Sequence, residues 1–434
     1  MSDLLLMGGG RGSYGEPFVY AGNLEYTIIE RDGSLNNYKL KLDPEGTYDF
    51  TIDWGDGSSD VITSYNQPET THAYSTLGPY TVSVSGRIDN TQFPEVNGTA
   101  SIPDWYISNI NSWGNFKIDT SGTFVRSYFS QGVSFPPYSP LNEFLRLTFA
   151  RSQAATNTSI DLNSWDTSSA TSLEGIFSEA NIGNLLINNW DTSAVTNMEN
   201  AFTSFISPNP LNISNWDVSN VTNFARMFNF TQNLTIGDIT GWDTSSATTM
   251  EDMFYTSTFN QNISTWNVSN VQSFRGMFGQ NFFFNQPIGS WDMSSATTIQ
   301  SMFNLGSVFN QPIGNWNTSN VQKFIWIFGG DLFSNNRTPF NQDISNWDFT
   351  GCLDNGAMQY IFGIDLGGYT PYCSMSRANY EALLISWASQ AANMPTGMLN
   401  INSDFVYGAG SAAETARNTL VNTYGWIITD GGAV

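Results

Sequence analysis

Carboxylates are the only ionisable side chains that this sequence supplies in number. The chain has 38 Asp and Glu residues but one histidine, His72, and two cysteines, Cys352 and Cys373. One histidine excludes most histidine-dependent catalysis, and this set is too small for a Cys/His zinc site. The number of carboxylates alone still leaves acid/base pairs open.

The best candidate for a metal site is the turn region that holds Asp53, Asp56 and Asp60. Their spacing does not match a calcium-binding EF-hand loop, so we favour a turn without metal and keep calcium as the alternative. The glycine-rich stretch 8–12 neither follows a strand nor opens a helix, which excludes a phosphate loop. We therefore expect no catalytic residues and no cofactor.

The two cysteines lie 21 residues apart, and their state stays open. A disulfide in an oxidising compartment and two buried free thiols give the same sequence pattern.

Charge limits the choice of partner. The formal net charge is −23, with only 15 Lys and Arg residues, and charged residues make up 12% of the chain. Nucleic acids and anionic membranes both require clustered basic side chains, so neither is an expected partner. No stretch approaches the roughly 20 apolar residues of a membrane-spanning helix. Residues 1–12 also lack the basic and apolar regions of a cleaved secretion signal.

A repeat of about 25 residues organises the chain from residue 162 to 362, and such a period is typical of a solenoid. An aliphatic residue stands three before each repeat tryptophan, Asp or Asn follows it directly, and in seven copies a phenylalanine follows twelve later. The repeat tryptophans are Trp165, Trp190, Trp216, Trp242, Trp266, Trp291, Trp316 and Trp347.

The spacing within each copy predicts a coil made of a strand, an Asx/Ser turn and a short helix. The segment that leads to the tryptophan has extended character, and Asp or Asn followed by Ser is typical of turns. Apolar residues such as Val271, Phe274, Met277 and Phe278 have helical spacing. We expect parallel pairing between coils at about 4.8 Å. The tryptophans then form a structural ladder in the core rather than a binding stripe, and the Asn and Gln residues bond to backbone groups in the turns.

The repeat resembles the BspA-type leucine-rich repeats of the DUF285 class. The stretch from Asn262 to Phe278 carries the motif, and about eight copies cover nearly half of the chain. The resemblance implies a solenoid like that of leucine-rich repeats and a surface-exposed adhesion or interaction role, with no catalytic residues to transfer.

The N-terminal part, residues 23–100, has short alternating segments separated by turns. Asp53-Trp54-Gly55-Asp56-Gly57, His72-Ala73-Tyr74 and Gly78-Pro79-Tyr80-Thr81-Val82 resemble three elements of the PKD family. That resemblance implies an immunoglobulin-like β-sandwich that serves as a spacer or binding module, with His72 as a structural residue beside the turn.

The other segments are expected to flank these two. Residues 1–22 form a tail or an arm, residues 101–161 are degenerate capping repeats, and residues 363–434 form a small α/β cap. In the cap, Ser376 is a predicted helix N-cap, 412–424 a second helix and 426–429 a strand.

Departures from the period are the best candidates for partner contacts. They comprise an apolar run in the arm and phenylalanines in two loop insertions: Leu4, Leu5, Leu6, Met7, Phe282, Phe283, Phe284 and Phe333.

These features predict a mostly β, non-enzymatic, exterior binding protein. We expect it to be mounted on a virion, as a phage head decoration or fibre protein, with the N-terminal region on a capsid, tail or surface scaffold. A bacterial cell-surface adhesin is the alternative, and a carbohydrate-active protein is a distant one. The outward partner is a host-surface protein or glycan.

Overall fold

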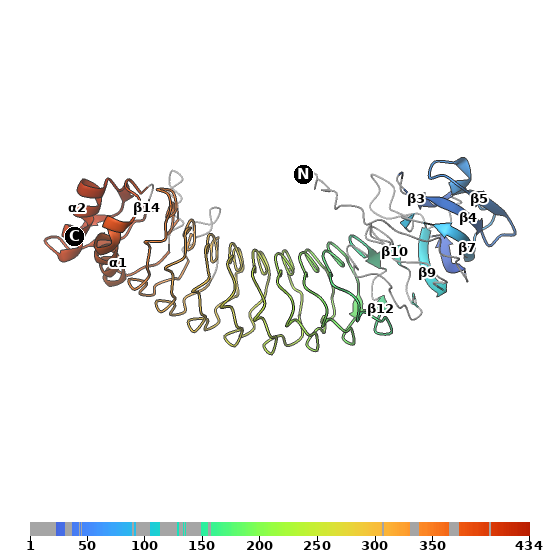
Figure 1. The fold of residues 1–434 in the computed structure, drawn as a ribbon, viewed down its shortest axis with the longest axis horizontal. Coiled ribbons are helices and arrows are strands. Elements are labelled where there is room, and N and C mark those ends of the chain that lie inside the picture. The colour runs from blue at the N-terminus through green and yellow to red at the C-terminus, as the bar shows by residue number, and fades with distance from the viewer. Residues whose placement is uncertain are drawn as a thin grey trace.

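The computed structural model describes residues 23–30, 37–42, 44, 46–88, 91–92, 105–112, 128–129, 133, 135, 149–154, 158–305, 308–329, 338–363, 373–398 and 401–434. It is a mainly β chain with few helices. A sheet lies at the N-terminal end, a curved row of stacked coils follows, and two helices lie at the C-terminal end (Figure 1).

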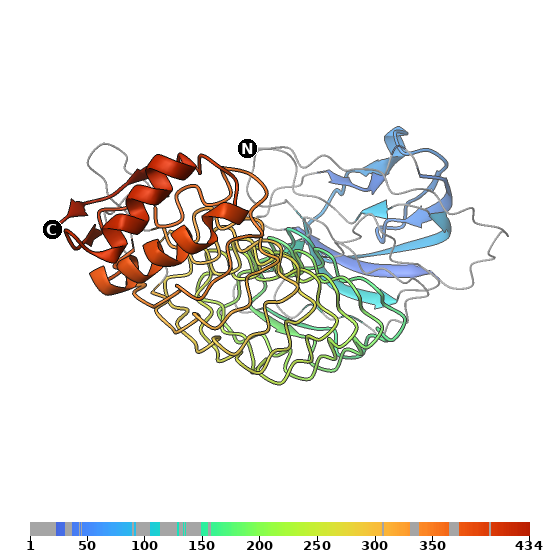
Figure 2. The same cartoon turned by 60° about the vertical axis from the view of Figure 1, so that its left-hand side comes forward.

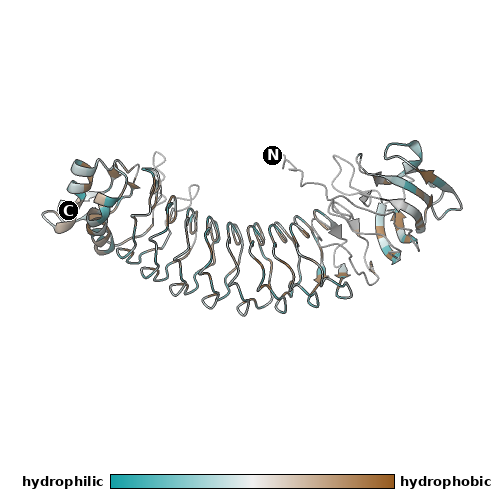
Figure 3. Cartoon of the chain, in the orientation of Figure 1, coloured by the Kyte–Doolittle hydropathy of each residue, from teal (hydrophilic) through white to brown (hydrophobic). Residues whose placement is uncertain are grey.

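The N-terminal sheet has seven strands in the order β11-β10-β9-β1-β7-β4-β5. Alternation of apolar and polar residues along the strands buries one set of side chains, as with Tyr48, Phe50 and Ile52 of β4 (Figure 3). The strands are β1 (Leu24–Glu30), β4 (Tyr48–Asp53), β5 (Ser59–Ile62), β7 (Tyr80–Ile88), β9 (Trp105–Ser112), β10 (Tyr128–Phe129) and β11 (Gln153–Ala154).

Two short antiparallel pairs accompany this sheet. They are β2 (Tyr38–Lys39) with β6 (Thr71–His72), which follows the 3-10 helix η1 (Pro68–Thr70), and β3 (Lys41–Leu42) with β8 (Thr91–Gln92). The large sheet is antiparallel from β5 to β9 and parallel from β9 to β11. Parallel pairing therefore begins at β9–β10, so one sheet leads directly into the coils.

Two tight turns follow one another in each coil. The Trp266 N–H donates to the Ile263 carbonyl at 3.1 Å, and the Val271 N–H donates to the Val268 carbonyl at 2.9 Å. The aliphatic-x-x-Trp spacing is thus the spacing of a β-turn, so the predicted strand does not continue to the tryptophan. Strands in the described coils are limited to β12 (Ser159–Asp161) and β13 (Asn184–Leu186), which pair in parallel. Single parallel bridges seven residues after each tryptophan link later coils, for example Asn223 to Thr249.

The predicted short helix in each coil is wrong. The segment after the second turn is a run of turns, in which every second N–H donates to the next coil. Phe274 N–H bonds to the Thr298 carbonyl and Phe278 N–H to the Met302 carbonyl, both at 3.0 Å. An α-helix would keep these donors within its own segment, so the turns form because neighbouring coils supply acceptors. Left-handed residues such as Asp252 and Gln280 bend the chain between these bonds.

Rings from successive coils stack in the core. The Trp190 and Trp216 ring centroids lie 6.1 Å apart, and those of Phe202 and Phe228 lie 5.6 Å apart. Six indole N–H groups donate to the aliphatic residue's carbonyl in the preceding coil, as Trp266 does to Ile239 at 3.1 Å. The spacing of the motif therefore places these buried indole N–H groups beside backbone acceptors, and it also stacks the rings that form the core.

The C-terminal cap covers the last coil. Helices α1 (Arg377–Gln390) and α2 (Ala412–Tyr424) lie side by side (Figure 2). Ser376 caps α1 by accepting from the Asn379 N–H, as predicted, and α2 ends at left-handed Gly425. The remaining elements are η2 (Ala391–Asn393), β14 (Ile401–Asn402), β15 (Val406–Tyr407), β16 (Ile428–Thr429) and β17 (Gly432–Ala433). Cys352 and Cys373 are buried thiols, and no disulfide bond joins them.

Candidate interaction surface

The carboxylates around the N-terminal turn bond to their own neighbours. Asp56 accepts from the Ser58 N–H at 3.0 Å and lies 2.8 Å from His72 Nε2, while the Trp54 indole donates to Asp60 at 2.7 Å. Burial alone would raise the pKa of Asp56, but the bonds from Ser58 and His72 outweigh it and lower that pKa to about 2. His72 also stacks on the Trp54 ring. These hydrogen bonds therefore fix the conformation of the turn, and the contacts of His72 with Asp56 and Trp54 are those of a structural residue.

The Asp and Asn residues that follow each tryptophan form Asx turns, as predicted. Asp292 Oδ1 accepts from the Ser294 N–H at 3.0 Å, and Asn267 does the same with Ser269 at 3.1 Å. The bonds from Ser294 lower the pKa of Asp292. An acceptor oxygen is all that the turn requires, which explains why Asn replaces Asp.

Asparagine and glutamine side chains form a ladder on the return segment. Asn285 Oδ1 accepts from the Asn310 N–H at 3.0 Å and from Gln311 Nε2 at 3.1 Å. The next step up, Asn310, accepts in the same way from Asn341 and Gln342. The prediction that these amides satisfy backbone groups is confirmed.

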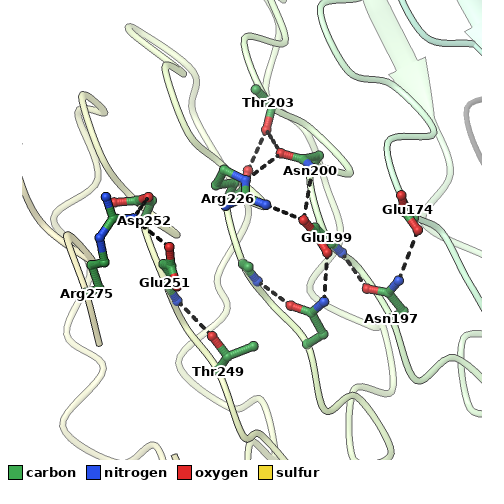
Figure 4. A network of polar contacts seen from close by, with 12 residues as sticks. Glu174, Asn197, Glu199, Asn200, Thr203, Arg226, Thr249, Glu251, Asp252 and Arg275 are labelled. Atoms are coloured by element: carbon green, nitrogen blue, oxygen red, sulfur yellow. Dashed lines mark hydrogen bonds and ion pairs between the residues drawn. The ribbon is translucent and has the colours of Figure 1, made fainter. Parts of the chain in front are cut away.

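A charged flank runs across the coils of Trp165 to Trp266, nine to ten residues after each tryptophan, and most of its charges are paired (Figure 4). Arg226 bonds to Glu199 of the preceding coil, and Arg275 contacts Glu251 at 2.6 Å and Asp252 at 3.3 Å. Burial raises the pKa of Asp252, and Arg275 opposes that rise. These side chains therefore link successive coils through ion pairs.

A different edge of the coils carries large exposed side chains. We call it the inner edge: residues 203–209, 229–235, 255–261, 279–285, 304–305 and 308–310, which lie 13 to 19 positions after five successive tryptophans. Strands β10 and β11 begin a row of parallel pairing between successive coils. The parallel bridge between Asn181 and Ile206, each four residues after the core phenylalanine of its coil, continues that row. Strand β10 lies on the concave side of the curve, so the inner edge lines that side (Figure 1).

The inner edge combines exposed apolar residues with an absence of charge. Its five segments contain no Asp, Glu, Lys, Arg or His, although the chain carries a net charge of −23. Phe282 and Phe283 are 50% and 53% exposed, and Ile206 is 58% exposed. Phe230 and Val308 are also exposed. Apolar side chains that gather on one face without charge are typical of a binding surface.

A buried amide holds the most exposed part of this edge in shape. Asn281 Nδ2 donates to Ser257 Oγ at 3.2 Å and to the Phe259 carbonyl at 3.0 Å. Its Oδ1 accepts from the Phe283 N–H at 2.9 Å and from the Phe284 N–H at 3.0 Å. The two exposed rings therefore sit on a fixed backbone.

Family comparison bears on the coils alone. Residues 145–236 and 229–336 match the family described as "Mycoplasma protein of unknown function, DUF285". These coils are similar to the DUF285 family. No curated protein and no solved structure matches the chain. The matched family has no known function, so the chemistry of this surface is inferred from the residues themselves.

The predicted contact residues divide into three groups. Phe282 and Phe283 are exposed on the coils, while Leu4, Leu5, Leu6, Met7 and Phe333 lie outside the described residues. Phe284 is the correction, because it is fully buried and stacks on Phe278 with centroids 3.7 Å apart. The bonds from Asn281 turn it inward, and it fills the place that Phe259 and Phe309 fill in adjacent coils.

Sequence reasoning missed Ile206, Phe230 and Val308. They stand 16, 14 and 17 positions after their tryptophans, the same interval that holds Phe282 and Phe283. A comparison of that interval across all copies of the repeat would have found them. The eight ladder tryptophans, by contrast, are all buried.

Among the residues that the structure describes, no three His, Cys, Asp or Glu side chains lie close enough together to hold a metal ion. Neither α1 nor α2, nor any other helix in the described ranges, is long and apolar enough to cross a membrane.

Proposed function

We propose that this chain is a non-enzymatic binding protein that acts on an exterior surface, and that the inner edge of its coils is the contact face. The observation that carries this is a charge-free edge on five successive coils, four of which expose large apolar side chains. Elsewhere on the array, exposed polar groups bond to neighbouring coils or to their own turns, as Arg226 and Asp292 do.

The proposal also covers the fold class of each part of the chain and the surface on which the chain is displayed. We class the array as a solenoid like that of leucine-rich repeats, and the N-terminal sheet with its two flanking pairs as a PKD-like spacer. A virion is the setting we favour, with the N-terminal region attached to a capsid, tail or scaffold protein. A bacterial cell surface is the alternative setting.

Labelling of intact particles and intact cells from the source, with an antibody against the purified chain, tests this function. We expect label on the outside of one of the two, and deletion of residues 1–15 is expected to remove the chain from particles. Label confined to the cell interior would contradict the function. Turnover of any glycan by the purified chain would overturn the non-enzymatic assignment.

A further inference from the structure

The inner edge offers two kinds of group to a ligand. The first is apolar: Phe282 and Phe283 protrude on one coil, Phe230 two coils earlier and Val308 one coil later. The second is a row of side-chain amides, one per coil, at Asn260, Asn285 and Asn310. Apolar platforms with a few fixed polar groups are the usual lining of a site for an organic ligand.

The amide row has spare donors. Each of Asn260, Asn285 and Asn310 uses its Oδ1 to accept from the next coil. Because Oδ1 points along the ladder, the Nδ2 group is the part of each side chain without an assigned bond among the described residues. These N–H₂ groups recur with the coil and can donate to oxygens that recur along an extended ligand.

Charge limits the classes of ligand that the inner edge can bind. A chain with a net charge of −23 repels polyanions, and an edge without Asp or Glu gives a polycation nothing to pair with. The phenyl faces of Phe282 and Phe283 favour C–H groups, because aromatic faces carry partial negative charge. An uncharged polymer with both C–H faces and oxygen atoms fits this combination.

A protein partner fits less well. Protein interfaces centre on Trp, Tyr and Arg. The exposed large residues in the described inner edge are instead Phe, Ile and Val side chains, and they include no Trp or Arg. The concave side also favours a long ligand that crosses several coils over a flat protein surface (Figure 1).

We infer that the inner edge binds a neutral linear polysaccharide, which runs across successive coils with its sugar rings against Phe282 and Phe283 and its hydroxyl groups on the asparagine row. This inference rests on the proposed function and names its ligand class. It requires no bond making or breaking.

Calorimetric titration of the purified full chain with cellohexaose, mannohexaose and maltohexaose tests the inference, with hexagalacturonate as the anionic comparison. We expect at least one neutral hexasaccharide to bind and hexagalacturonate to bind at least about 10-fold more weakly. The F282A/F283A double variant should weaken that binding about 10-fold or more, and Asn285→Ala about 3-fold.

A matched control is the V61A/L77A double variant, which removes two exposed apolar side chains from the N-terminal part and should leave the Kd unchanged. Thermal unfolding should be the same for both double variants and the parent, because all four side chains are exposed.

Three outcomes overturn the inference: none of the neutral hexasaccharides binds at millimolar concentration, F282A/F283A binds as the parent does, or hexagalacturonate binds as tightly as the neutral sugars. If the chain labels an outer surface and yet binds no hexasaccharide, the proposed function stands and this inference fails.

Discussion

The ladder of tryptophans and the inner edge belong to the same coils, yet they obey different constraints. Every repeat tryptophan is kept, because its ring stacks on the next coil and its N–H in most copies bonds to the previous one. The exposed apolar residue of the inner edge varies between coils, from Ile206 to Phe230 to Phe282. It can vary because these side chains form no hydrogen bonds with the backbone of the neighbouring coil. Uniformity between copies thus marks residues that the coils need from one another, and variation marks residues that the coils do not need.

The largest test of this contrast is Trp266→Ala. The substitution removes a buried ring that stacks on Trp242 at 6.2 Å and a bond to the Ile239 carbonyl. We expect the free energy of unfolding to fall by about 4 kcal/mol. Urea denaturation followed by fluorescence measures this change. A loss below about 1 kcal/mol would show that the coils do not need this tryptophan from one another.

Asn281→Ala tests the link between core and inner edge. It removes four hydrogen bonds and leaves the buried Phe284 N–H without its acceptor, which should cost about 2 kcal/mol. Urea denaturation gives the loss in stability, and hydrogen exchange at the Phe283 and Phe284 amides should accelerate. Unchanged exchange would show that another group fixes the two exposed rings.

A smaller effect is expected at the Asx turns. Asp292→Ala should cost about 1 kcal/mol, whereas Asp292→Asn should be nearly neutral because Asn267 makes the same bonds. The pKa of Asp292 is lowered in the folded chain, so the carboxylate's stabilisation is full above the unfolded pKa near 4 and fades as pH falls below it. Thermal unfolding of parent and D292A at pH 7 and pH 3 checks this, since the difference should shrink at pH 3.

The smallest effect is predicted where variation is greatest. Phe282→Ser and Phe283→Ser should each change the free energy of unfolding by less than about 0.5 kcal/mol, because both rings lie half in solvent. Denaturation in urea measures both. A loss comparable to that of Asn281→Ala would mean that the rings pack in a way that contradicts the contrast.

Much of this arrangement could be predicted from the printed residues, and the limits have physical causes. The Asx turns and amide ladder followed from local chemistry, since Asp292, Asn267 and Asn285 bond within two residues or one coil. Both cap helices followed from capping signals and apolar spacing.

The backbone path of the coils could not be predicted in this way. The spacing of Val271, Phe274, Met277 and Phe278 suits a helix as well as a run of turns. Only the acceptors of the next coil decide between them, and these lie about 25 residues away in sequence. The exposure of Phe284 was wrongly predicted for a similar reason. The side-chain amide of Asn281 directs Phe284 into the core, where its ring stacks on Phe259 of the preceding coil.

The asparagine ladder ends on the first turn of α1, where the Ser376 N–H and Asn379 Nδ2 bond to Asn341 as a further coil would. Helix α1 thus imitates the next rung of the stack. A cap that recognises only the last rung is indifferent to how many rungs stand before it, so whole coils can be gained or lost without redesign of either end. The length of the inner edge is then adjustable in steps of one coil, and with it the length of ligand that the chain can span.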